Sequence, residues 1–294
     1  MLAEIQALKE GMLKAGYICD DNAATVLFLA QALSKPVLVE GPAGVGKTSI
    51  AQAFARMRNL SLVRLQCYEG IDEAKAMYEW NYKKQLLHIQ AVSHRSLDIA
   101  EVEKQIFSEE FLLARPLLQV ITSEERSCLL IDEIDKVDFE FEAMLLELLA
   151  EFQITLPELG TIKARQIPFV FLTSNATREL SEALKRRCLY LYLDFPSPPM
   201  EESILRLKVP GLRNELAAQL ARALHDLRKL ELKKTPSIAE GIDWALALVT
   251  MGIGEIDREI VVQTLNVLLK YQEDIDKARA RIPAPTGQST RIMQ

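Results

Sequence analysis

The sequence predicts an α/β domain with a parallel five-stranded sheet, followed by a small all-helical domain. Five short apolar runs bounded by turn residues lie at 36–40, 60–66, 127–131, 169–173 and 189–193. Helical stretches separate most of these runs, which favours a parallel sheet covered on both faces. Beyond a proline cluster at 194–199, the apolar residues recur only at helical spacing.

Helices are expected on both sides of the first strand. Leu2 to Met12 carries apolar residues at helical spacing, and Asp20, Asp21 or Asn22 caps a second helix that continues to about Leu33. A third is expected at 48–58. In the second domain, we expect helices at 216–230, at 236–251 and at 257–275.

The chain is thus predicted to have three parts. Residues 1–195 form an α/β nucleotide-binding domain, 196–282 a helical domain, and 283–294 a mobile polar tail. Two βαβ units that share a strand need only about 60 residues. The span from the run at 36–40 to the run at 127–131 is longer, and the surplus lies at about 67–107, where we expect an inserted segment.

The composition of the chain limits the kinds of function and binding site to be expected. The 294 residues are 49% hydrophobic and 26% charged, as in a globular protein, and the net charge of -6 argues against general affinity for nucleic acid. Four scattered cysteines and three histidines without a metal-binding pattern argue against zinc or disulfides and suit a reducing cytoplasm. The acidic N-terminus is unlike a signal peptide, and no apolar run is long enough to span a membrane.

The strongest motif is a glycine-rich loop, Gly41-Pro-Ala-Gly-Val-Gly-Lys-Thr48, which fits G-x-x-x-x-G-K-[ST] between a strand and a helix. Its backbone N–H groups cradle phosphates, Lys47 reaches the β- and γ-phosphates, and Thr48 ligates Mg²⁺. ATP and Mg²⁺ are therefore the expected cofactors. The candidate cofactor-binding residues of this segment are Gly41, Pro42, Ala43, Gly44, Val45, Gly46, Lys47, Thr48 and Ser49.

A second motif ends the strand at 127–131. Asp132 lies at the carboxyl edge of the sheet, where it can hold Mg²⁺ together with Thr48, and Glu133 beside it can polarise an attacking water. Hydrolysis then proceeds by attack of that water on the γ-phosphate, with Glu133 as base. The nearby Asp135-Lys-Val-Asp138 only superficially matches the guanine-selecting motif of GTPases, because it follows the Mg²⁺ strand instead of a later one.

Two further candidate catalytic residues follow in chain order. Asn175, after the strand at 169–173, can orient the attacking water or touch the γ-phosphate. Arg187, or Arg186 if the register is off by one, precedes the last strand and is placed to sense phosphate. The predicted catalytic set is therefore Lys47, Glu133, Asn175 and Arg187.

In this order of motifs the sequence resembles the AAA+ family, and within it the MoxR group. Gly41–Thr48 looks like Walker A, Leu129–Glu133 like Walker B, Asn175 like sensor 1 and Arg187 like the arginine finger. Segments 111–118, 156–161, 184–188 and 234–237 look most similar to the CoxD-type branch.

The resemblance implies a homo-oligomeric ring, expected to be a hexamer, that remodels a client metalloenzyme with a von Willebrand A-domain partner. For the CoxD-type branch the implied client is a carbon monoxide dehydrogenase with a molybdenum–copper site.

The resemblance also bears on other segments. It implies a hairpin before sensor 1, at about 153–166, and such hairpins and insertions usually face a ring pore or a client. Tyr78, Trp80 and Tyr82 alternate in the insertion, which also suits a half-buried strand. MoxR-like lids often carry a Pro-Arg as sensor 2, whereas this chain has Pro236-Ser237, so that Lys233 or Lys234 would have to substitute. Two alternatives stay open: a DNA-acting AAA+ motor, and a nucleotide-regulated scaffold that hydrolyses little.

Overall fold

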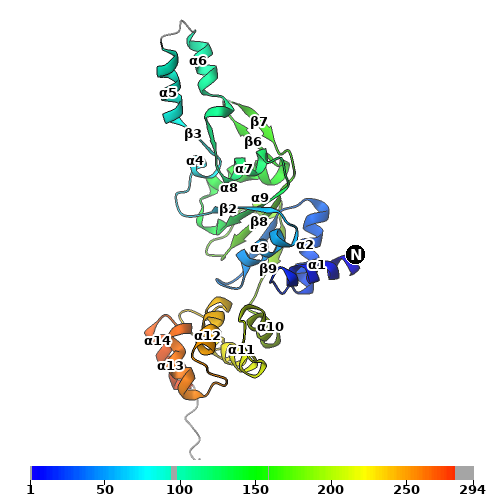
Figure 1. The fold of residues 1–294 in the computed structure, drawn as a ribbon, viewed down its shortest axis with the longest axis vertical. Coiled ribbons are helices and arrows are strands. Elements are labelled where there is room, and N and C mark those ends of the chain that lie inside the picture. The colour runs from blue at the N-terminus through cyan, green and yellow to red at the C-terminus, as the bar shows by residue number, and fades with distance from the viewer. Residues whose placement is uncertain (1, 94–97, 158, 282–294) are drawn as a thin grey trace, which may run out of the picture. The chain divides into compact units, whose positions relative to one another are not determined.

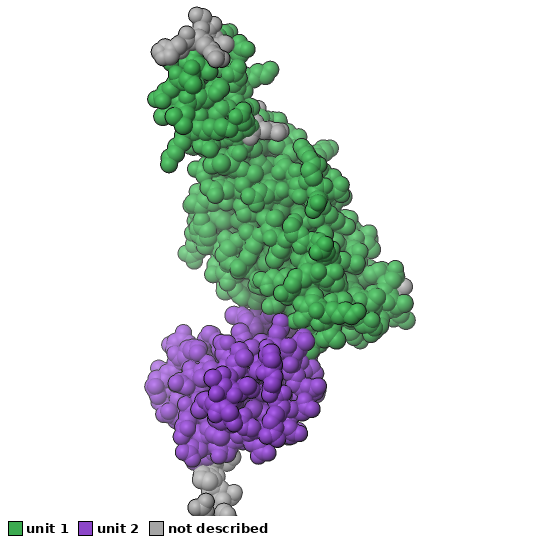
Figure 2. Space-filling view, viewed as in Figure 1, with its two compact units in different colours: residues 1–41, 47–193 green, residues 42–46, 194–294 purple. Residues whose placement is uncertain are grey.

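The computed structural model describes residues 2–93, 98–157 and 159–281, and the chain divides into two compact units (Figures 1 and 2). The first contains the described residues up to Gly41 and Lys47–Leu193; the second contains Pro42–Gly46 and the described residues from Asp194. Five residues of the glycine-rich loop therefore cluster with the helical unit. The tail expected at 283–294 lies outside the described residues.

The predicted five-stranded sheet is confirmed. Its strands are β1 (Val37–Glu40), β2 (Ser61–Gln66), β5 (Ser127–Asp132), β8 (Phe169–Ser174) and β9 (Leu189–Tyr192). They run parallel in the order β2-β5-β8-β1-β9. This order brings the carboxyl ends of β1, β5 and β8 to one edge, so the motifs that follow these strands meet there.

Both faces of this sheet are covered, as its apolar strands require. Leu129 and Ile131 of β5 pack on the face covered by α7 (Pro116–Thr122) and α8 (Phe139–Glu151). Cys128 and Leu130 point to the other face, which is covered by the helices on either side of β1. These are α1 (Leu2–Lys14), α2 (Asp21–Leu33) and α3 (Lys47–Met57).

Asp20 caps α2, because its carboxylate accepts a hydrogen bond from the Ala23 N–H at 2.7 Å. Two short helices adjoin strands of the sheet in sequence. η2 (Ile134–Lys136) follows β5, and α9 (Glu182–Lys185) precedes β9.

The segment between β2 and β5 is a helical hairpin on a small antiparallel ribbon. It comprises α4 (Glu73–Ala76), β3 (Tyr78–Trp80), α5 (Tyr82–Val92), α6 (Ile99–Ile106), η1 (Glu109–Phe111) and β4 (Leu112–Ala114). Figure 1 shows α5 and α6 extending away from the sheet within the first unit. Trp80 is buried against Phe107, whereas Tyr82 is exposed. Of the three alternating aromatic residues, Trp80 is therefore a core residue.

The strands β6 (Gln153–Leu156) and β7 (Gly160–Lys163) form an antiparallel hairpin between α8 and β8. Ile154 and Leu156 are buried in the same core cluster as α7 and α8. The hairpin is thus anchored to the sheet domain through one face of β6.

The second unit is helical, as predicted, and helices occupy most of the ranges expected at 216–230 and 236–251. Its helices are α10 (Pro198–Lys208), α11 (Asn214–Arg228), α12 (Ile238–Thr250), α13 (Arg258–Leu268) and α14 (Gln272–Arg281). The proline cluster at 194–199 reaches into the first of these helices: Pro198 starts α10, at a position that tolerates proline because its N–H needs no partner.

The helix expected at 257–275 is broken after Leu268, where Leu269 is extended. The break lets the fully buried Asp274 of α14 accept hydrogen bonds from the backbone N–H groups of Lys233 (2.8 Å) and Lys234 (3.1 Å). These bonds tie α14 to the segment that leads into α12. Among the described residues, no helix is long and apolar enough to cross a membrane.

Candidate functional site

The glycine-rich loop takes a conformation that only glycine suits. Gly41, Gly44 and Gly46 have φ angles of 151°, 77° and 101°. A Cβ on Gly41 would overlap the carbonyl oxygen of Leu193 in the first unit, and a Cβ on Gly44 would overlap the side chain of Ser237 in the second. Glycine is required at both positions for backbone angle and for space.

Lys47 begins α3 and is 7% exposed. Its Nζ donates to the carbonyl oxygen of Gly41 at 2.7 Å and to Oδ1 of Asn175 at 2.8 Å. Burial lowers the pKa of Lys47, and the charges of Asp135, Asp132 and Glu133 oppose that shift. The ammonium group is thus held over the loop, beside Asn175, where phosphate oxygens can replace its present acceptors.

Asp132 ends β5 and is almost fully buried. It accepts hydrogen bonds from the hydroxyl of Thr48 at 3.0 and 3.2 Å and from the hydroxyl of Thr173. A hydroxyl and a carboxylate within hydrogen-bond reach are hard oxygen donors that fit Mg²⁺. In the described part of the chain, no cluster of three or more His, Cys, Asp or Glu residues could hold a metal ion.

Glu133 follows directly and has left-handed backbone angles (φ 60°, ψ 48°). Its N–H donates to the Thr173 hydroxyl at 2.9 Å, which stabilises this uncommon conformation. The Glu133 carboxylate accepts from Nε2 of Gln66 at 2.8 Å and from Nζ of Lys136 at 2.5 Å. The carboxylate is part-exposed and lies next to Asp132, where a base for an attacking water is needed.

Asn175 follows β8 and contacts the loop lysine directly. The adjoining segment is held by the buried Asp135, whose carboxylate accepts from the Thr177 N–H at 3.1 Å and its hydroxyl at 2.6 Å. Burial raises the pKa of Asp135, but hydrogen bonds from Thr177 and from backbone N–H groups together outweigh burial and leave the pKa lowered. Lys47, Thr48, Asp132 and Asn175 thus form one connected group in the first unit.

Two arginines occupy the link between α9 and β9. Arg187 is half-buried, and its Nη1 donates to the Ala183 carbonyl at 2.8 Å. Arg186 is exposed.

Ser237 occupies the position where the resemblance predicts an arginine. It caps α12 in a capping box with Glu240, and its N–H donates to the Glu240 carboxylate at 2.9 Å. Lys234 pairs with the same carboxylate at 2.8 Å, and Lys233 lies over the ring of Tyr271. Despite partial burial, the Lys234 and Ser237 contacts lower the pKa of Glu240 to about 2. Both lysines thus have partners within the second unit.

Sequence reasoning missed several residues of the site: Arg64, Gln66, Thr173, Asp135 and Lys136. Arg64, Gln66 and Thr173 lie in predicted strands, but their contacts with Asp132 and Glu133 depend on which strands are neighbours. Lys136 instead pairs locally with Glu133, three residues earlier in the chain.

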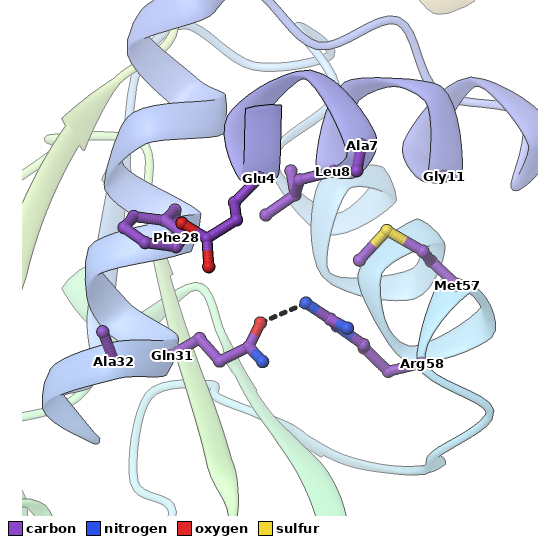
Figure 3. A pocket seen from close by; sticks show the side chains of 9 residues that line it. All are labelled: Glu4, Ala7, Leu8, Gly11, Phe28, Gln31, Ala32, Met57 and Arg58. Carbon is purple, nitrogen blue, oxygen red and sulfur yellow. Dashed lines mark hydrogen bonds between the residues drawn. The ribbon is translucent and has the colours of Figure 1, made fainter. Parts of the chain in front are cut away.

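A separate surface hollow of about 500 Å³ lies among α1, α2 and the end of α3 (Figure 3). Figure 3 shows the side chain of Gln31 bonded to Arg58 at its base. Met57 and Arg58 lie at the opposite end of α3 from Lys47, about 15 Å along the axis at 1.5 Å per residue. The hollow is thus distinct from the phosphate-loop site.

Three comparisons bear on family and fold. A family model described as the AAA domain of the dynein-related subfamily matches residues 36–188, just over half of the chain. Two solved variants of RuvB from Thermotoga maritima each match with a TM-score of 0.50 and 19% identity. One match covers 90% of this chain and 70% of the RuvB chain, and the other covers 88% of this chain and 69% of the RuvB chain. No curated protein matches the sequence. At that identity the structural likeness shows the fold alone.

Proposed function

Because the chain belongs to the AAA domain family, in its dynein-related subfamily, and is an ATPase of this type, we propose that it is a MoxR-type chaperone powered by Mg²⁺–ATP. The observation that carries the ATPase chemistry is the connected group of Lys47, Thr48, Asp132 and Asn175. Charged, hydroxyl and amide groups meet there, with Lys47 hydrogen-bonded to the first glycine of the loop, as phosphoryl transfer requires.

Each residue then has one task. Lys47 binds the β- and γ-phosphates, Thr48 and Asp132 hold Mg²⁺, and Asn175 orients the attacking water. Glu133 accepts the proton of that water as it attacks the γ-phosphate. When bound by Thr48 and Asp132, Mg²⁺ would supply positive charge against the negative charge that develops during transfer. Arg187 completes the site of a neighbouring subunit in a homo-oligomeric ring, which we expect to be a hexamer.

The chaperone role is supported by the helical hairpin of α5 and α6. Several of its apolar side chains are more than half exposed: Tyr82, Leu86, Leu87 and Ile99. An exposed apolar surface on an element that extends from an ATPase domain suits contact with a protein client. We propose that the client is a metalloenzyme, specifically the molybdenum–copper site of a carbon monoxide dehydrogenase, reached with a von Willebrand A-domain partner.

This proposal is tested in cells that make such a dehydrogenase. With the Lys47→Ala chain in place of the wild type, we expect dehydrogenase that is assembled but severely short of copper, measured as metal per purified enzyme. Lys14→Ala, an exposed change on α1, is the matched control and should leave the metal content intact. Full copper content with Lys47→Ala would contradict the client. ATP turnover that rises only on branched DNA would instead favour a DNA-acting motor.

The helical unit offers a second prediction at Ser237. Because Gly44 and Ser237 are in close contact within the second unit, an arginine at 237 is placed to reach a phosphate held by the loop. We expect Ser237→Arg to tighten ATP binding roughly tenfold, since a charge-assisted hydrogen bond contributes about 1.5 kcal/mol or more. Loss of the cap should destabilise α12 by about 1 kcal/mol.

Ser237→Ala is the control, because it removes the cap without adding a charge. Equilibrium binding of ATP and thermal melting, measured on both variants, separate the two effects. If Ser237→Arg binds ATP no tighter than Ser237→Ala, position 237 does not approach the phosphates.

A further inference from the structure

Asp132, the proposed Mg²⁺ ligand, has a cationic partner that the proposed mechanism does not use. The guanidinium of Arg64 donates to one carboxylate oxygen through Nε at 3.0 Å and through Nη2 at 2.5 Å. The other donors to Asp132 are the hydroxyls of Thr48 and Thr173. Arg64 therefore supplies the positive charge that a buried carboxylate needs.

The position of Arg64 explains how it reaches this carboxylate. On β2, Arg64 pairs in register with Leu130 of β5, and Gln66 pairs with Asp132. The Arg64 side chain therefore extends along the strands to reach a carboxylate that lies two positions beyond its own register partner. The Arg64 side chain is 49% exposed, whereas that of Asp132 is 3% exposed. Of the donors around Asp132, Arg64 has the longest side chain and faces solvent, so it can swing away.

The same guanidinium is also linked to the catalytic glutamate. Its Nη2 donates to Oε1 of Gln66, and Nε2 of Gln66 donates to the Glu133 carboxylate at 2.8 Å. A single residue on β2 thus contacts one carboxylate of the Walker B pair directly and the other through an amide.

We propose that Arg64 is a displaceable counter-cation of Asp132: it neutralises this carboxylate before Mg²⁺–nucleotide binds and competes with the metal for the same oxygen. The inference rests on the proposed function, because it assigns the metal to Asp132.

Two physical facts set the competition. A guanidinium stays protonated in proteins, so Arg64 cannot relieve repulsion from Mg²⁺ by losing a proton and must move. Mg²⁺ requires oxygen ligands at about 2.0–2.1 Å in octahedral geometry, which a carboxylate engaged by an arginine fork cannot supply freely. Displacing Arg64 therefore uses part of the free energy of metal binding. Arg64 thus lowers the affinity of the site for the metal.

The test is metal affinity in the presence of ADP, where no turnover occurs. Mn²⁺ replaces Mg²⁺, and the free ion is counted by its paramagnetic resonance signal. We expect Arg64→Gln to lower the apparent Kd for Mn²⁺ about three- to fivefold, the range that a part-exposed ion pair of up to ~1 kcal/mol supports. Arg58→Gln makes the same change of charge at the far end of α3 and should shift the Kd less than twofold.

Unchanged or weaker Mn²⁺ binding in Arg64→Gln would overturn the inference; weaker binding would mean that Arg64 supports the bound nucleotide. If the wild-type protein fails to bind Mn²⁺ with ADP at all, the proposed function fails together with the inference. Unchanged affinity with intact binding overturns the inference alone.

A metal-free measurement tests the ion pair itself. In urea unfolding without metal or nucleotide, Arg64→Gln should lower the midpoint when Asp132 is present. In the Asp132→Asn background the same change should have little effect, because the partner charge is gone. Equal shifts in both backgrounds would show that Arg64 does not act through Asp132.

Discussion

Arg187→Ala is expected to bind ATP nearly as well as the wild type and to lose about 10³–10⁵-fold in turnover. An arginine finger stabilises charge that develops on the phosphates in the transition state, so its loss affects rate much more than ground-state binding. In its own subunit the Arg187 side chain bonds to the Ala183 carbonyl. The proposed target is the phosphate held by the neighbouring subunit.

Mixing experiments separate this role from a local one. Arg187→Ala combined with Lys47→Ala should recover part of the activity, because a mixed interface can pair an intact phosphate loop with an intact finger. Phosphate release from each protein alone and from the mixture is the measurement. Arg186→Ala is the matched comparison, because Arg186 is exposed and next in sequence. Loss of turnover in Arg186→Ala alone would move the finger by one residue. A protein that stays monomeric with ATP and keeps full activity in Arg187→Ala contradicts the ring.

Glu133→Gln is the second change with a large expected effect. The amide keeps the size of the side chain and its contact with Gln66 but cannot accept a proton, so ATP should still bind while turnover falls about 10²–10⁴-fold. Glu125→Gln removes the same charge at an exposed position before β5 and should leave turnover unchanged. If Glu133→Gln loses ATP binding as well, the side chain supports the nucleotide and is not primarily a base.

Much of the fold follows from local patterns. Short apolar runs bounded by turn residues predicted the five strands, and alternation with helices predicted that they run parallel. The phosphate loop was predictable because its glycines, lysine and threonine are consecutive, so no tertiary contact is needed to recognise them. Asp132 and Asn175 could be placed at the same edge because each follows a buried strand of one parallel sheet.

The contacts between strands could not be read from the sequence in the same way. Arg64 looks like an ordinary exposed strand residue until the order β2-β5 and the pairing of Gln66 with Asp132 are known. The break between α13 and α14 depends on Asp274, whose partners lie about 40 residues earlier in the chain. Trp80 belongs to an alternating aromatic pattern, yet burial against Phe107 of a later segment gives it a core role.

We propose that this site hydrolyses ATP through Glu133, with Mg²⁺ held by Thr48 and Asp132. Bound ATP and released phosphate can be followed in the same sample for the wild type and Glu133→Gln, each with Mg²⁺. We expect equal initial ATP occupancy, steady phosphate release from the wild type and a stable ATP complex in the variant. Phosphate release from Glu133→Gln at the wild-type rate would contradict the assignment of the base and, with it, the proposed mechanism.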